Sequence, residues 1–77
     1  MIPISLLPHA KKDLNIVRPH AHAYVILGLL SLRQPSKTGV PLKGALEGLF
    51  SLPVAGYTII YMPYGRKKAR YVVRILG

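Results

Sequence analysis

YTIIYMPYGRKKARYVVRILG, residues 57–77, carries the strongest structural signal in this sequence. Its first part, Tyr57–Met62, is β-branched and aromatic with almost no polar break, which is typical of a central strand covered on both faces. PYGRKK predicts a turn, and ARYVVRIL alternates again as a second strand. We expect two opposed sets of side chains in that second strand: Tyr71, Val73 and Ile75 on one face, and Arg70, Val72, Arg74 and Leu76 on the other.

The N-terminal part predicts a short strand followed by two helices. Apolar residues alternate along IPISLL, residues 2–7. Pro8 suits the first turn of a helix, and Pro19 must end that helix because its ring blocks the helical hydrogen-bond pattern. The second helix, His20–Arg33, carries apolar residues at i, i+3, i+4 and i+7, which we expect to face the core: Ala23, Ile26, Leu27 and Leu30.

The middle of the chain predicts a loop and then a strand. Gln34–Gly44 is a loop by its proline, glycine and serine content, and Pro53 indicates a sheet edge or the end of a strand. The element order is therefore β-α-α-β-β-β. This order predicts an α+β fold in which a helical hairpin covers one face of a three-stranded antiparallel meander. We expect residues 1–77 to form a single domain.

Charge is the dominant feature of the composition. Eleven Lys and Arg face two acids, Asp13 and Glu47, which gives a net charge of +9. Such a surface attracts polyanions such as nucleic acid or an acidic protein segment. There is no cysteine, so disulfides and thiolate chemistry are excluded. The start of the chain lacks the pattern of a signal peptide, and its longest apolar stretch, Ala23–Leu32, is too short to cross a bilayer, so we expect a soluble cytoplasmic protein without a membrane partner.

The basic residues provide the candidate binding site. The turn residues Arg66, Lys67 and Lys68 precede two strand arginines, Arg70 and Arg74, which we expect to share one face. Lys37 and Lys43 flank a loop that could reach a phosphate. The alternative is that exposed lysines at a hairpin tip only keep a sheet edge soluble.

Two tyrosines, Tyr57 and Tyr61, could stack on bases, although packing in the core is the more frequent role of aromatic residues in such a strand. His20 and His22 diverge on a helix, so no closed metal site is expected. We expect Asp13 to be a solvated or capping acid in an early helical turn. No catalytic residue and no cofactor are indicated.

Several motifs, in their order along the chain, resemble the RelE/ParE superfamily of toxins from toxin–antitoxin pairs. ISLLPHAKKDL resembles the family's opening strand and helix, LFSLPVAGYTIIYMP its central hairpin, and YVVRILG its last strand. The Ser-x-Pro-Val before the tyrosine strand and the late Arg-Ile-Leu are closer to ParE-type sequences. The resemblance implies a toxin that binds and inhibits DNA gyrase and is neutralised by a cognate antitoxin.

RelE-type members, which cleave mRNA on the ribosome, usually carry basic residues where this chain has Ser51, Pro53 and Thr58. Cleavage without a strong general base relies on cations to stabilise the charge that develops on the phosphate, so the resemblance favours binding over catalysis. ParE-like relatives also tend to have arginine at the positions of Phe50 and Met62, and usually continue past the last strand, so we expect a shortened C-terminus here. The alternatives are a RelE-like mRNA endonuclease and a detoxified, basic RNA-binding relative.

Overall fold

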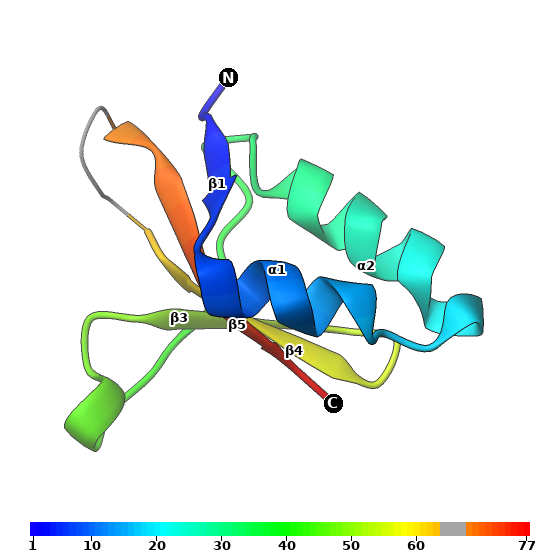
Figure 1. Ribbon diagram of the computed structural model, residues 1–77. Helices are drawn as coiled ribbons and strands as arrows, with labels where there is room; N and C mark the ends of the chain where they lie inside the picture. Colours follow the sequence, from blue (N-terminus) through cyan, green and yellow to red (C-terminus); the bar gives the residue numbers. More distant parts are fainter. Residues whose placement is uncertain (64–67) are drawn as a thin grey trace.

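The fold is built around the C-terminal hairpin (Figure 1). In this computed structural model of residues 1–77, the described residues are 1–63 and 68–77. The elements follow the chain in this order: β1 (Ile4–Leu6), α1 (Pro8–Asn15), α2 (Pro19–Ser31), β2 (Val40–Pro41), the short 3-10 helix η1 (Gly44–Leu46), β3 (Phe50–Val54), β4 (Tyr57–Met62) and β5 (Arg70–Leu76).

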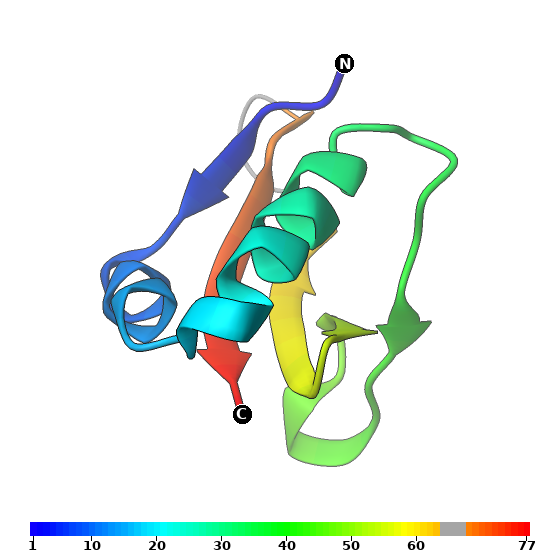
Figure 2. The same ribbon diagram turned by 90° about the vertical axis from the view of Figure 1, so that its right-hand side faces the viewer.

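One five-stranded sheet has the order β1-β5-β4-β3-β2. All neighbours are antiparallel except β1 and β5, the first and last strands, which pair in parallel. Both helices lie on the same side of the sheet (Figure 2). The expected α+β architecture and element order are confirmed. The connection between β3 and β4 is a two-residue turn in which Ala55 and Gly56 both have positive φ, as a tight hairpin requires.

The core lies between α2 and the middle of the sheet. The side chains of Val25 and Leu32 are completely buried there against the fully buried Ile59, Tyr61 and Val72. α1 packs instead against β5 and β1, and makes few contacts with α2. The expected helical hairpin is therefore splayed, and each helix covers its own part of the sheet.

β5 departs from simple alternation because it contains a β-bulge. Ile60 pairs with Arg74 but the next residue, Tyr61, pairs with Val72, so Val73 is an extra residue in β5. An extra residue reverses which face the following side chains occupy. Val72 and Ile75 are consequently both buried in the core, and the expectation that Arg70 and Arg74 share a face is wrong.

The buried face of α2 also differs from the expected stripe. The buried residues are Ala21, Val25 and Leu29. The expected residues Ala23, Leu27 and Leu30 are exposed, and Ile26 is half-buried. α2 is apolar almost all round, so periodicity permits more than one stripe, and only packing against the sheet selects between them.

Two smaller differences concern the sheet. β2 lies inside the expected loop, where Val40 pairs with Ser51 and Pro41 with Phe50. Gly39, just before β2, lies so close to the Ser51 backbone that a Cβ there would overlap its carbonyl oxygen. The expected covering of β4 on both faces is wrong: the helices cover one face only, and Ile60 on the other face is half-buried.

Within residues 1–63 and 68–77, no helix is both long and apolar enough to span a membrane.

Candidate binding surface

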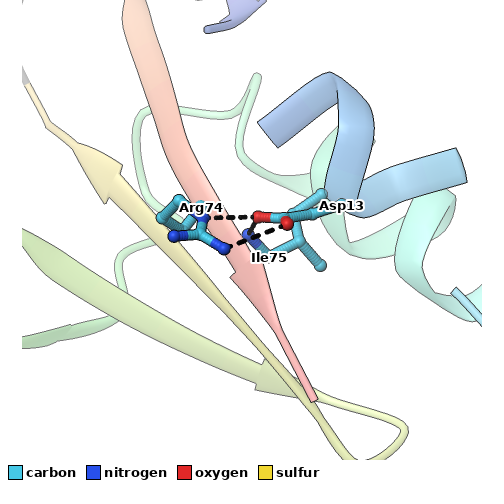
Figure 3. A network of polar contacts seen from close by, with 3 residues as sticks. All are labelled: Asp13, Arg74 and Ile75. Carbon is cyan, nitrogen blue, oxygen red and sulfur yellow. Dashed lines mark hydrogen bonds and ion pairs between the residues drawn. The ribbon is translucent and has the colours of Figure 1, made fainter. Parts of the chain in front are cut away.

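An acid on α1 closes the open edge of β5 (Figure 3). β1 pairs with β5 only as far as Val72, so the later part of β5 has no neighbouring strand on that side. α1 runs alongside it and places Asp13 there. The Asp13 carboxylate accepts a hydrogen bond from the backbone N–H of Ile75 at 2.9 Å and two from the Arg74 guanidinium, at 2.7 and 3.2 Å.

These contacts change the role expected for both charged residues. Asp13 is buried, so the expectation of a solvated or capping acid is wrong. The hydrogen bond from Arg74 lowers the pKa of Asp13, and the same hydrogen bond raises the pKa of Arg74. The charge of Arg74 is paired within the molecule and contributes little to an attractive surface.

Arg70 is a core residue. It is only 2% exposed, and its Nη1 donates hydrogen bonds to the carbonyl oxygens of Leu32 at 3.0 Å and Lys37 at 2.6 Å. Its guanidinium also lies 5.7 Å from the centre of the Tyr61 ring. The expectation that Arg70 contributes to an exposed binding face is therefore wrong: it anchors the loop after α2 to the sheet.

That anchor brings backbone segments that carry three exposed cations close to one another. Arg70 binds the carbonyl groups of Lys37 and of Leu32, the residue directly before Arg33. Lys68 lies two residues before Arg70 in the chain. All three of these cationic side chains are exposed. We call Arg33, Lys37 and Lys68 the cationic end. Lys68 has a φ of 58°, an uncommon backbone conformation for a lysine.

Other proposed site residues lie elsewhere. Arg66 and Lys67 fall outside the described residues. Lys43 is exposed beside η1, on the β2–β3 connection (Figure 1). The remaining exposed cations among the described residues lie on α1 and at the turn between the helices: Lys11, Lys12 and Arg18. Among the described residues, Lys68, Arg70 and Arg74 therefore do not form the shared docking face that was expected.

The two tyrosines are held by backbone contacts. Tyr61 is completely buried, and its hydroxyl accepts a hydrogen bond from the Gly39 N–H at 2.7 Å. It therefore packs in the core, the role that the sequence favoured, and cannot stack on bases. Tyr57 is half-buried, and its hydroxyl accepts a hydrogen bond from the Arg18 N–H at 3.0 Å. Both rings lie on the helix side of the sheet.

The opposite side of the sheet carries the positions where RNA-cleaving relatives are expected to have cations. Pro53 on β3 pairs with Thr58 on β4, and Ser51 pairs with Ile60. Neither β3 nor β4 contains an ionisable residue other than its tyrosines, Tyr57 and Tyr61. This part of the sheet can bind through shape and apolar contact, but it lacks charged groups for acid–base chemistry or for neutralising a phosphate.

No group of three metal-ligating side chains occurs among residues 1–63 and 68–77.

The roles of Asp13 and Arg70 were missed at the sequence level. A signal was present for Asp13: in a chain with two acids and eleven basic residues, an acid has many candidate partners. The sequence contains no such signal for Arg70. Only the bulge and the path of the loop after α2 determine which arginine of β5 points into the core.

Comparison with solved structures shows what this fold is similar to. No protein-family model matches the sequence, and no curated protein matches it either. The fold is similar to that of a chain in the crystal structure of the RelBE2 toxin–antitoxin complex from Mycobacterium tuberculosis, with a TM-score of 0.84. The match covers 97% of this chain and 95% of that chain at 23% sequence identity. At that identity the likeness establishes the fold.

The cationic end makes a testable contribution to polyanion binding. We expect the Lys37→Gln/Lys68→Gln double variant to bind a duplex DNA about three- to ten-fold more weakly at low salt, with a salt dependence shallower by about 0.9 per lost phosphate contact. Fluorescence anisotropy at several salt concentrations measures both quantities. Lys11→Gln/Lys43→Gln is the matched control, since it also removes two exposed lysines, on α1 and beside η1. If the control variant lost as much affinity for DNA, net charge alone, and not the cationic end, would account for the binding.

Proposed function

We propose that this chain is the toxin of a type II toxin–antitoxin pair, acting in the cytoplasm by binding DNA gyrase, and neutralised by a cognate antitoxin. Two independent observations support a toxin. The sequence motifs resemble the RelE/ParE superfamily in their order along the chain, and the fold is similar over 97% of its length to a chain of a toxin–antitoxin complex.

The observation that favours binding over cleavage is the uncharged surface of β3 and β4. Ser51, Pro53 and Thr58 lie together on the side of the sheet away from the helices. Cleavage of RNA develops negative charge on the phosphate and the leaving group, which enzymes stabilise with cations or oriented donors. Arg74, which pairs with Ile60 on the neighbouring strand, is already bound to Asp13.

The charge balance supports an antitoxin of opposite charge. With a net charge of +9, the chain attracts an acidic segment at long range. Exposed cations lie at the cationic end, on α1 and between the helices, so a partner that wraps around the chain would meet several of them.

Controlled expression in bacteria without an antitoxin tests this function. We expect growth arrest with early loss of DNA synthesis and a DNA-damage response, while total mRNA persists. Purified protein should inhibit DNA supercoiling by gyrase in vitro. An Arg70→Ala variant, which we expect to be poorly folded, serves as the inactive control.

Two results would contradict the proposed mechanism. Rapid cleavage of mRNA that depends on ribosomes would support the RelE-like endonuclease instead. Normal growth at high levels of folded protein would favour a basic RNA-binding relative without toxicity.

A further inference from the structure

Both ends of the segment between α2 and β2 are fixed to other parts of the fold. Figure 2 shows this segment crossing from the end of α2 to β2; it comprises residues 33–39, and we call it the α2–β2 loop. At its start, the carbonyl oxygen of Arg33 accepts a hydrogen bond from the N–H of Ile2 at 2.8 Å. At its end, the N–H of Gly39 donates to the hydroxyl of Tyr61 at 2.7 Å. The loop therefore enters and leaves along a defined path.

Arg70 holds the middle of the loop from inside the molecule. Its Nη1 donates to the carbonyl oxygens of Leu32 and Lys37, and the N–H of Lys37 donates to the carbonyl oxygen of Gln34 at 3.0 Å. Arg70 and Tyr61 are among the largest fully buried side chains of the described residues. Two buried polar side chains thus direct their hydrogen bonds to the backbone of the same loop.

The side chains of the loop are exposed, in contrast to the anchors of its backbone. Every residue from 33 to 38 is exposed. The anchors therefore order an exposed surface. A loop that is already held in one conformation loses little entropy when a partner binds, so fixing it in advance strengthens binding.

The charge around the loop is positive. Arg33 and Lys37 belong to the loop, and Lys68 completes the cationic end. Arg70 adds a buried charge, since its guanidinium stays protonated and has no carboxylate partner within the described part of the chain. The sequence contains no acid in residues 14–46, so neither the loop nor the helix before it carries a competing carboxylate. Such a concentration of one sign of charge attracts anions.

The side chains of the loop fit phosphate groups better than they fit a protein surface. Ser36 and Thr38 carry hydroxyl groups and Gln34 carries an amide, and all three side-chain types donate to phosphate oxygens in nucleic-acid complexes, as lysine and arginine do. Pro35 is the only large apolar side chain of the loop, so the loop lacks the apolar centre that protein interfaces have. A nucleic-acid backbone is the ligand that these groups match.

We propose that the α2–β2 loop and Lys68 form a preformed site for the phosphates of a nucleic-acid backbone, and that Arg70 and Tyr61 are its positioning residues. Arg33, Lys37 and the polar side chains of the loop contact the phosphates. Arg70 and Tyr61 touch no phosphate and hold the backbone from which those groups extend. DNA and RNA share this chemistry. The site goes beyond the proposed inhibition of gyrase, because it binds nucleic acid without gyrase.

A variant of Tyr61 separates the positioning of the loop from its charge. Tyr61→Phe removes the hydroxyl that holds Gly39 and leaves every cation in place. We expect it to bind a fluorescein-labelled duplex DNA about three-fold more weakly at low salt, because the loop must then be ordered on binding. Fluorescence anisotropy measures this affinity. Tyr57→Phe is the matched control: its hydroxyl also accepts a backbone N–H, that of Arg18 at the opposite end of α2, and its loss should leave the affinity unchanged.

A second comparison distinguishes positioning from a general loss of stability. In the Arg33→Gln/Lys37→Gln background, Tyr61→Phe should no longer change the affinity, since the cations that the loop positions are absent. Circular dichroism checks that each variant is folded under the assay conditions. In the parent protein, the amide chemical shifts of residues 33–39 and of Lys68 should move when DNA is added. A parallel series with a duplex RNA of the same sequence identifies, by the tighter binding, which nucleic acid supplies the phosphates.

The proposal fails if Tyr61→Phe binds both duplexes as tightly as the parent protein does, or if Tyr57→Phe loses as much affinity. It also fails if Tyr61→Phe weakens binding equally in the Arg33→Gln/Lys37→Gln background, which would trace the loss to stability. A glutamate-rich peptide is the last probe: if it bound as tightly as the duplexes and moved the same amide shifts, the loop would be a docking site for an acidic protein segment instead. The growth assay measures no binding to nucleic acid, so the proposed toxin function can fail or stand independently of these results.

Discussion

Replacing Arg70 with alanine is expected to lower the free energy of unfolding by about 3 kcal/mol. The substitution removes the donor for two backbone carbonyl groups, those of Leu32 and Lys37, and leaves a cavity where the fully buried side chain was. It also removes the contact between the guanidinium and the Tyr61 ring. Since small domains have little stability in reserve, a large part of the population should be unfolded or loosely folded near 37 °C.

Urea denaturation followed by circular dichroism measures this loss. Arg33→Ala is the matched control: it removes the same charge from an exposed position and should cost less than about 0.5 kcal/mol. Tyr61→Phe should cost about 1 kcal/mol, because it removes only the hydroxyl that accepts from Gly39. If Arg70→Ala proved as stable as the Arg33 control, Arg70 would have to be exposed in solution.

Replacing Asp13 with alanine is expected to cost about 2 kcal/mol. The change leaves the Ile75 N–H without its acceptor beside a buried strand and removes both hydrogen bonds to Arg74. It therefore reopens the edge of β5 that α1 covers. Edges of this kind promote pairing between molecules, so we also expect the variant to aggregate at a lower concentration than the parent protein.

Thermal unfolding and light scattering measure these two effects. Glu47→Ala is the natural comparison, since Glu47 is the other acid of the chain and is exposed. It should change the free energy of unfolding by less than about 0.5 kcal/mol. Equal losses in the two variants would show that overall charge, and not the contacts of Asp13, determines the effect.

The same carboxylate predicts an acid-dependent loss of stability. Hydrogen bonding from Arg74 lowers the pKa of Asp13 in the folded protein below its ordinary value of 3.8. The unfolded chain therefore takes up a proton more readily. The contribution of Asp13 is complete above that ordinary value and disappears as the pH falls through the folded pKa. We expect constant stability between about pH 7 and 5 and a decline below about pH 4, which should be shallower in Asp13→Asn.

The sequence predicted the elements well because their signals are local. Alternation in β5, the apolar run of β4 and the prolines at the starts of both helices are each determined within a few residues. The two-residue strand β2 was missed since its formation depends on pairing with β3. Local patterns cannot indicate pairing partners that lie farther along the chain, as Ser51 and Phe50 do for Val40 and Pro41.

The candidate site was less predictable because long-range packing decides it. The extra residue in β5 turned Arg70 inward, and neither neighbour of that residue differs from an ordinary strand sequence. α2 has apolar residues on several sides, so periodicity alone could not identify the buried one. Leu27 and Leu30, which periodicity placed in the core, are exposed. Net charge alone did not locate the exposed cations, since it counts Arg70 in the core and Lys68 at the surface alike.

The parallel pairing of β1 with β5 has a consequence for how the protein is made. Two early residues have partners far along the chain: Ile4 pairs with Arg70, and Asp13 accepts a hydrogen bond from the N–H of Ile75. During translation, the early segments must wait without these partners until β5 leaves the ribosome. The complete sheet, and any binding surface that depends on it, is therefore absent from the nascent chain until that point.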